Sequence, residues 1–225
     1  MATIIREIER ADSEIINQLR RIPPSDFGHR INFQLIGSRL VKPVYKIKQQ
    51  FAGSAITVRI PPNDSVMVYK ALEFAKPGDV IVIDMSGDKR YACWGEITTR
   101  VAQAKGVVAA IVNGPVTDSA EIEELGFNVY ATGLSPLTTK LHGIDGDINV
   151  PVAIDDVVIY PGDIVVGNND GILVVPRDEG KKYLQIGKEE CEADRQRKDR
   201  LAAVGADEYI QALDKYLQTM NINWK

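Results

Sequence analysis

The chain has 225 residues and a formal net charge of −4, which is enough length for one globular domain with a packed core. Apolar residues make up 44% and charged residues 26%, a composition typical of a folded soluble protein. Lys and Arg form no block free of acidic neighbours, which disfavours nonspecific binding to nucleic acid or to an anionic membrane. Two cysteines are too few for a disulfide framework, no apolar run approaches the roughly 18 residues of a membrane span, and the first residues show no signal-peptide core. We therefore expect a cytoplasmic protein.

Isoleucines recur at helical spacing near the N-terminus, with charged residues between them. This pattern predicts an amphipathic helix over residues 3–21, and Pro23-Pro24 ends it. Residues 25–50 show no firm period, so we expect irregular structure with some strand there.

The middle of the chain alternates between apolar runs typical of buried strands and amphipathic segments. Strands are predicted over residues 55–60, 80–84, 107–112 and 129–131, and helices over residues 65–75, 95–105 and 118–125. Gly106 and Gly126 follow two of these helices, where glycine commonly ends a helix. Such alternation predicts parallel strand pairing across residues 80–131.

Residues 148–176 contain short β-runs divided by turn sequences, a pattern typical of hairpins. A highly charged helix is predicted over residues 178–203, and apolar residues between 209 and 217 mark a last amphipathic helix. A charged helix with few apolar side chains buries little surface by itself. We expect it to lie against a neighbouring subunit, and a solvated helix is the alternative.

Gly95 lies between a predicted strand and a predicted helix. If the helix begins there, the backbone N–H groups of Glu96, Ile97 and Thr98 belong to its first turn and lack partners within the helix. They point out of the positive end of the helix, which suits a carboxylate or phosphate, and Gly95 allows a ligand to approach the backbone closely. The alternative is a plain helix start whose N–H groups bond to water.

Asp118 lies at the next strand-to-helix junction, at the end of Asn113-Gly114-Pro115-Val116-Thr117-Asp118. It also begins a D-x-x-E pattern with Glu121, so its carboxylate could simply cap its own helix. A hard cation such as Mg²⁺, which takes one or two carboxylates and several waters, would use the same side chain. The two roles are compatible, because a carboxylate accepts in several directions.

Other candidate site residues are weaker. His29 and His142 have no partner at ligand spacing, and both are expected in surface loops. Cys93 is expected to be a small packing residue, since nothing nearby would activate its thiol. The chain contains no phosphate-binding loop, dinucleotide-binding, zinc-protease or nucleophile-elbow motif.

Short segments spread over residues 52–178 match one known family in order and spacing. They are residues 52–58, 77–80, 94–96, 104–107, 113–118, 121–122, 126–127, 149–152 and 170–171. On these segments the chain resembles the family of RraA-like proteins and of 4-hydroxy-4-methyl-2-oxoglutarate and 4-carboxy-4-hydroxy-2-oxoadipate aldolases. Many short matches in one order and spacing are more specific than any single one. The terminal helices align less clearly.

The resemblance implies an α/β fold, a three-layer β/β/α domain of the swivelling type. One domain would span residues 1–225, with a core at about residues 50–178 and helical extensions over residues 3–21 and 178–219. The resemblance also implies a homotrimer or homohexamer, with the site between subunits.

The resemblance further implies a metal-dependent lyase site. Backbone N–H groups from Gly95 to Thr98 would hold pyruvate, and Mg²⁺, Mn²⁺ or another divalent cation would lie on Asp118 and waters. The metal would polarise the keto oxygen and stabilise the enolate left by C–C cleavage, and such sites commonly decarboxylate oxaloacetate as well. A carboxylate from the adjacent subunit's C-terminal helix, here Glu189 or Glu190, would assist proton transfer.

Thr117 departs from this family pattern, because the active aldolases have an Arg before the aspartate. That Arg contacts the keto oxygen, and a short uncharged hydroxyl cannot replace a guanidinium. Loss of one such donor typically costs on the order of 10²–10³ in rate. Arg90 or Lys89, in the loop before Gly95, could reach the site instead, and a charged loop facing solvent is the alternative.

Three hypotheses about function are open at the level of sequence. The first, which we favour, is a metal-dependent lyase acting on a 2-oxo acid. The second is a non-catalytic regulator, like the family members that bind and inhibit an RNA-degrading endonuclease, since an acidic surface could dock on a basic partner. The third is a site retuned for a different acid through Thr117.

Overall fold

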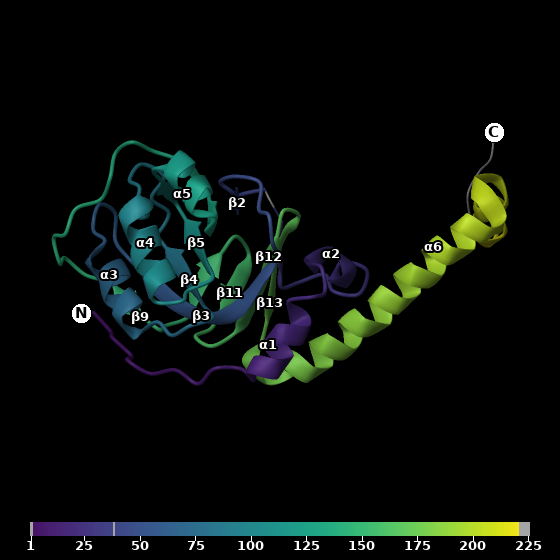
Figure 1. Ribbon diagram of the computed structural model, residues 1–225, viewed down its shortest axis with the longest axis horizontal. Coiled ribbons are helices and arrows are strands. Elements are labelled where there is room, and N and C mark those ends of the chain that lie inside the picture. The colour runs from purple at the N-terminus through teal and green to yellow at the C-terminus, as the bar shows by residue number, and fades with distance from the viewer. Residues whose placement is uncertain (1, 38, 221–225) are drawn as a thin grey trace.

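A mixed β-sheet forms the centre of the molecule (Figure 1). Within residues 2–37 and 39–220, the part of the chain that the computed structural model describes, nine strands join it in the order β1-β13-β12-β3-β4-β5-β7-β2, with β9 paired to β3. These strands are β1 (Leu35–Gly37), β2 (Lys42–Pro43), β3 (Phe51–Arg59), β4 (Asp79–Asp84), β5 (Ala109–Asn113), β7 (Asn128–Ala131), β9 (Asp147–Ile148), β12 (Ile164–Asn168) and β13 (Gly171–Val175). β3, β4, β5 and β7 run parallel to one another, which confirms the predicted parallel pairing.

Three helices cover one face of the parallel strands (Figure 1). They are α3 (Val66–Phe74), α4 (Glu96–Ala104) and α5 (Ser119–Leu125), close to the predicted bounds. Alternate strand residues such as Ile81 and Val112 face this layer, where they share a core with the buried indole of Trp94. Gly106 and Gly126 follow α4 and α5 with φ of 76° and 65°, a left-handed conformation that glycine adopts without strain.

A small second β layer lies on the other face of the sheet. β10 (Val152–Ile154) and β11 (Val157–Ile159) form an antiparallel hairpin, and β12 and β13 form another, as the turn sequences predict. The hairpin of β10 and β11 packs on Val80, Val82 and Ala109, which point away from the helices. A separate parallel pair joins β6 (Pro115–Val116) to β8 (Gly133–Leu134). The small hairpin, the main sheet and the helices confirm the β/β/α layering.

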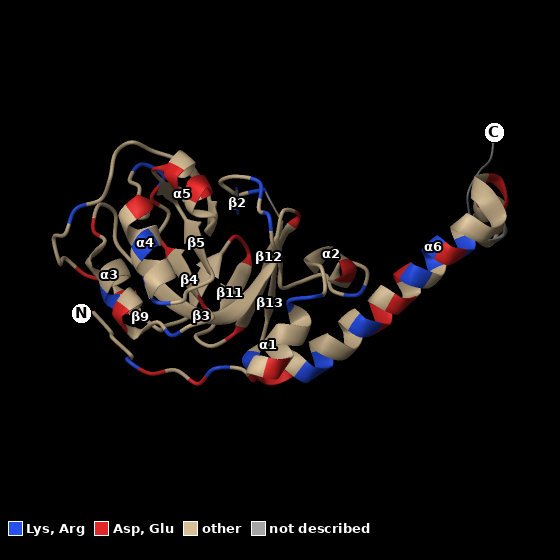
Figure 2. Ribbon diagram, in the orientation of Figure 1, with Lys and Arg blue, Asp and Glu red and all other residues tan. Residues whose placement is uncertain are grey.

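Helices from both ends of the chain pack together at the β12–β13 side of the sheet. They are α1 (Ser13–Leu19), α2 (Pro24–Phe27) and the beginning of α6 (Gly180–Leu217), which follows the short 3₁₀ turn η1 (Arg177–Glu179). The rest of α6 projects from the body, with acidic and basic residues interspersed along it (Figures 1 and 2). Gly205, with φ 77° and ψ 171°, interrupts it, so the two predicted C-terminal helices meet at a kink. Within the described residues, no helix is long and apolar enough to cross a membrane.

The predicted helix over residues 3–21 is wrong for its first half. Residues 3–12 lie in an extended segment along the body, and α1 covers only part of the second half. Ile4 pairs with Ile148 as in a parallel strand, and the Arg10 guanidinium donates two hydrogen bonds to Asp79, both at 2.8 Å. These tertiary contacts override the helical spacing of the isoleucines, because local propensity is the weaker effect.

Candidate functional site

The carboxyl ends of β4 and β5 meet at the edge of the sheet where ligands commonly bind in α/β folds. The loop after β4 leads to Gly95 and α4, and the loop after β5 leads to Asp118 and α5. Both junctions line one surface hollow with a volume of about 250 Å³, together with the start of α3 and with Thr138, Thr139 and Leu141. The two predicted half-sites therefore form one site, which we call the hollow.

Asp118 connects the two halves of the hollow. Its Oδ2 accepts the backbone N–H of Glu96 at 2.9 Å, and its Oδ1 accepts the hydroxyl of Thr117 at 3.0 Å. A Cβ atom on Gly95 would lie 2.5 Å from the same Oδ2 and 2.7 Å from Cγ2 of Thr117. Any side chain at residue 95 would thus displace the carboxylate, which gives this glycine a steric role.

The prediction that Asp118 caps its own helix is wrong. Its side chain makes no capping hydrogen bond to α5 within the described structure, and its backbone is left-handed, with φ 56° and ψ 43°. Aspartate tolerates this conformation better than most residues. Because the carboxylate is directed toward Glu96, it caps α4 from outside.

The first turn of α4 keeps two of its three predicted N–H groups for a ligand. Asp118 occupies the N–H of Glu96, whereas those of Ile97 and Thr98 have no acceptor in the described part of the chain. The Glu96 side chain forms an ion pair with Arg100 at 2.7 Å, so neither the side chain nor the N–H of Glu96 is left for a ligand. Two N–H groups at a positive helix end can still bind one carboxylate.

The opposite wall of the hollow consists of side chains that the sequence analysis missed. The hydroxyl of Thr139 donates to that of Ser65 at 2.9 Å, so the loop and the start of α3 are joined. Pairing of Ala92 with Thr138 brings this loop beside Gly95. No sequence motif marks these residues, since hydroxyl side chains in a loop have many roles. The missed lining residues are Ser65, Tyr69, Thr138, Thr139 and Leu141.

Both histidines lie on the surface, as predicted, and neither lines the hollow. The backbone N–H groups of His142 and Ile144 donate to the buried carboxylate of Asp64, at 3.3 and 2.6 Å. Asp64 therefore fixes the loop that follows the hollow wall. His29 is exposed just after α2.

Arg90 and Lys89 do not line the hollow. The guanidinium of Arg90 lies over the ring of Tyr91, 5.5 Å from its centroid, and both basic residues are exposed. The predicted catalytic role of Arg90 is untested, and these contacts do not favour it. Cys93 is buried, and burial raises its pKa to about 12, so its thiol packs in the core as expected.

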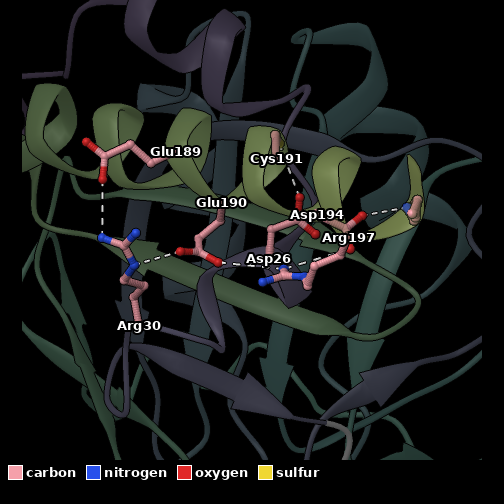
Figure 3. Close-up of polar contacts among 8 residues, drawn as sticks. Asp26, Arg30, Glu189, Glu190, Cys191, Asp194 and Arg197 are labelled. Atoms are coloured by element: carbon pink, nitrogen blue, oxygen red, sulfur yellow. Dashed lines mark hydrogen bonds and ion pairs between the residues drawn. The ribbon is translucent and has the colours of Figure 1, made fainter. Parts of the chain in front are cut away.

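Glu189 and Glu190 lie on α6, and neither lines the hollow of the same chain. Glu190 is 5% exposed, and its carboxylate is 2.6 Å from Nε of Arg30 and 3.9 Å from Arg197 (Figure 3). Glu189 is more exposed, and hydrogen bonding from Gln185 together with the charge of Arg30 lowers its pKa. Glu189 is thus the freer of the two, and its part in a neighbouring subunit's site stays a prediction.

The donor set of the hollow determines which metal it could hold. Among the described residues, no group of three or more His, Cys, Asp or Glu side chains is placed to bind a metal ion. Zinc sites usually need three or four such ligands, whereas Mg²⁺ is often held by one or two carboxylates and several waters. The exposed carboxylate of Asp118 has lone pairs beyond the two bonds that it accepts. The residues present therefore fit a hydrated divalent cation.

Sequence comparisons relate most of the chain to proteins with aldolase names. The sequence model of a family described as "RraA-like: Aldolase/RraA" matches residues 25–174. A Halalkalibacterium halodurans protein named "Putative 4-hydroxy-4-methyl-2-oxoglutarate aldolase" is 32% identical over 213 residues, 95% of this chain and 98% of that protein. A Thermus thermophilus protein named "4-hydroxy-4-methyl-2-oxoglutarate aldolase" is 31% identical over 129 residues, 57% of this chain and 77% of that protein.

Solved structures show the same architecture. The RNA-processing inhibitor RraA from Thermus matches with a TM-score of 0.61 and 27% identity, over 68% of this chain and 92% of that one. Streptomyces coelicolor RraAS2, described as an unusual member of the RNase ES inhibitor RraA protein family, matches with a TM-score of 0.74 over 85% of this chain and 100% of that one. Its 24% identity supports the fold alone.

Proposed function

Because the chain belongs to the RraA-like family, we propose that it is a divalent-metal-dependent lyase that acts on a 2-oxo acid through a pyruvate enolate. The observation that carries the proposal is the meeting of Asp118 with the first turn of α4 over one hollow. A carboxylate that suits a hard cation thus lies beside N–H groups that suit an organic acid. The names of two relatives point the same way, to an aldolase.

The residues of this chain would bind and orient the acid. The N–H groups of Ile97 and Thr98 would hold its carboxylate, and Gly95 leaves the space in which the Asp118 carboxylate reaches the first turn of α4. Asp118, fixed at both oxygens, would hold Mg²⁺, Mn²⁺ or another divalent cation in one orientation. When bound, that cation would polarise the keto oxygen and stabilise the negative charge that bond cleavage leaves.

Oxaloacetate and oxalate, a mimic of the enolate, test this function. We expect pyruvate release from oxaloacetate that needs Mg²⁺ or Mn²⁺ and stops with EDTA, and calorimetric binding of oxalate only with metal. Asp118→Asn keeps the side-chain size and tolerates the left-handed backbone, but it removes the charge. We expect it to lower metal-dependent release by roughly 10²-fold or more.

Glu121→Gln is the matched control, because Glu121 lies in the first turn of α5 but does not line the hollow. We expect this variant to keep wild-type release and oxalate binding. Wild-type protein that binds neither a divalent cation nor oxalate would overturn the proposed function.

A non-catalytic regulator is the second candidate. The likeness to the structure of an RNA-processing inhibitor favours it, as does the absence of a cationic side chain from the described lining of the hollow. Under this alternative, the acidic protein would bind a ribonuclease in place of a small acid. Affinity capture from the native organism's lysate distinguishes the two candidates. Specific recovery of a ribonuclease, together with failure to bind oxalate, would favour the regulator.

A further inference from the structure

A groove on the body of the molecule lies outside the hollow and shares no lining residue with it. It consists of two adjoining cavities, of about 530 and 600 Å³, and Tyr160 lines both of them. The first cavity lies between residues 32–35 and the β10–β11 hairpin. The second lies between the extended N-terminal segment and residues 176–179, directly before α6. We call the two cavities together the acidic groove.

Large apolar side chains are exposed in the acidic groove. Phe33 is 76% exposed, and Val158 and Tyr160 are each half exposed or more. Ile5 adds apolar surface from the N-terminal segment. Exposed apolar surface that is gathered in one place and bordered by polar residues is typical of a site where another polypeptide docks.

The acidic groove also carries an excess of negative charge. Besides the buried Asp163, five carboxylates line it, those of Glu9, Asp155, Asp156, Asp178 and Glu179. Three cations form ion pairs with these five, namely Arg177 in the lining and Arg39 and Lys182 beside it. The neighbouring charges of Arg6 and Glu7 cancel, and Lys181 adds one positive charge, so carboxylates remain in excess. A polypeptide that docks here should therefore be apolar and basic.

Residues 215–225 of the same chain have this complementary composition. They include two lysines and no Asp or Glu, together with Tyr216, Leu217, Met220, Ile222 and Trp224. Tyr216 and Met220, which lie in the described part, are 61% and 42% exposed. Their apolar surface thus has little cover within their own chain.

This segment cannot fill the acidic groove of its own chain. The groove includes Asp178 and Glu179 just before α6, whereas residue 215 lies near the other end of that helix. From Gly180 to the kink at Gly205 the helix is ~37 Å long, at about 1.5 Å per residue. The final turns of α6 stay at the far end of the projecting helix (Figure 1). Residues 218–225 reach ~29 Å at most when extended, so a groove within their reach belongs to another copy.

We infer that residues 215–225 of one copy of this chain dock in the acidic groove of a second copy. The lysines pair with the excess carboxylates, and the aromatic and aliphatic side chains cover Phe33, Val158 and Tyr160. Since the contact joins two different surfaces, it passes from copy to copy and closes when the copies form a ring. The inference does not depend on the proposed lyase function.

Cross-linking between two differently tagged copies tests the contact. One copy carries Val158→Cys in the acidic groove, the other carries Asn223→Cys beside Trp224, and a short bismaleimide joins thiols that lie close together. The native thiols react poorly, because Cys93 is buried and the pKa of Cys191 is raised to about 11. We expect a product that contains both tags.

Glu124→Cys, at an exposed position of α5, replaces Val158→Cys in the control, and no product with both tags is expected from it. Equal yields from the two positions, or no product from the groove position, would overturn the inference.

Peptide binding tests the chemistry of the contact. A labelled peptide of residues 215–225 is titrated onto the full chain carrying Trp224→Ala, so that the chain's own segment competes less. We expect Trp224→Ala in the peptide to weaken binding at least about tenfold, because large aromatic residues dominate such contacts. Asp156→Lys in the groove should also weaken binding, whereas Glu124→Lys on α5 should not. Equal binding of a scrambled peptide of the same composition would overturn the inference, since the surface would then attract any basic chain.

Discussion

At the residue scale, the site depends on how Asp118 is held. The left-handed backbone of Asp118 and its two hydrogen bonds, from Glu96 N–H and Thr117 Oγ1, fix the direction of the carboxylate. Gly95 contributes by having no side chain, so that the carboxylate can reach the first turn of α4. Thr117, where the resemblance led us to expect an Arg, donates a hydrogen bond to Asp118.

Gly95→Ala tests the steric role of Gly95. The added methyl group would lie 2.5 Å from Oδ2 of Asp118, so the carboxylate must move away from Glu96. We expect at least about tenfold weaker metal-dependent oxalate binding, or about 1.4 kcal/mol, in calorimetry. Gly133→Ala is the control, because a Cβ there meets nothing within 4 Å. Equal affinities for the two variants would refute the steric argument.

Thr117→Val tests the donor role of Thr117. Valine keeps the shape of threonine but removes the hydroxyl that donates to Oδ1 of Asp118 at 3.0 Å. A hydrogen bond to a charged group contributes about 1.5–3 kcal/mol to stability. This one is exposed to water, so we expect a smaller effect. The affinity for Mg²⁺ should fall roughly three- to tenfold. Thr117→Ser should keep wild-type affinity. If the Thr117→Val and Thr117→Ser proteins bind Mg²⁺ equally well, the hydroxyl of Thr117 has no positioning role.

At the scale of secondary-structure elements, the N-terminal segment is held by polar contacts more than by its own helical propensity. The N–H of Thr3 donates to Asp147 at 2.8 Å, and Arg59 forms an ion pair with the same carboxylate. Burial opposes ionisation of Asp147, but hydrogen bonds from Arg59 and Thr3 outweigh it, and the pKa of Asp147 lies below its usual value. The ionised carboxylate therefore stabilises the folded chain.

This contribution has a defined pH dependence. The pKa of Asp147 is lower in the folded chain than in the unfolded chain, where it is about 3.9. The stabilisation is therefore complete above about pH 3.9. It is lost as the pH falls through the pKa of the folded state. Asp147→Asn should lower Tm at pH 7, and the difference from wild type should shrink toward pH 3. Glu124→Gln, at an exposed position of α5, should show no such trend. A difference that stays constant with pH would contradict the linkage.

At the scale of the whole molecule, α6 reaches far beyond the surface that it covers (Figure 1). Its first turns pack on α1 and α2, whereas Leu201, Ile210 and Tyr216 are exposed further along. Long helices usually owe their stability to tertiary packing of one face. We therefore predict that α6 lies against a neighbouring subunit, in preference to a solvated helix.

The mass of the protein in solution tests this prediction. We expect a trimer or hexamer of the 24.8 kDa chain by light scattering, with slow hydrogen exchange along α6. Ile210→Asp should lower the mass while far-UV circular dichroism stays the same, and Asp207→Asn, on the same exposed stretch, should leave the mass unchanged. A monomer with fast exchange in α6 would favour the solvated helix.

The sequence by itself determined most of the strands and helices of the fold and the junctions at which the candidate site residues lie. Buried strands, helix ends at Gly106 and Gly126, and hairpin turns are encoded by nearby residues, so the pattern of periods and turns was sufficient to predict them. Gly95 and Asp118 were identifiable because each lies at a strand-to-helix junction of a parallel sheet, where ligand sites are common.

Only the tertiary structure decided what each of these residues contacts. Asp118 accepts a hydrogen bond from Glu96, which lies 22 residues away in the chain. The local sequence pattern instead favoured a capping box with the helix that follows Asp118. The extended course of residues 3–12 depends on β9 and Asp79, which no local period can reveal. The hydroxyl wall from residues 65 and 138–139 has the same origin. Local periodicity reports which face of an element is buried, whereas the site depends on contacts between distant segments that only the packed sheet brings together.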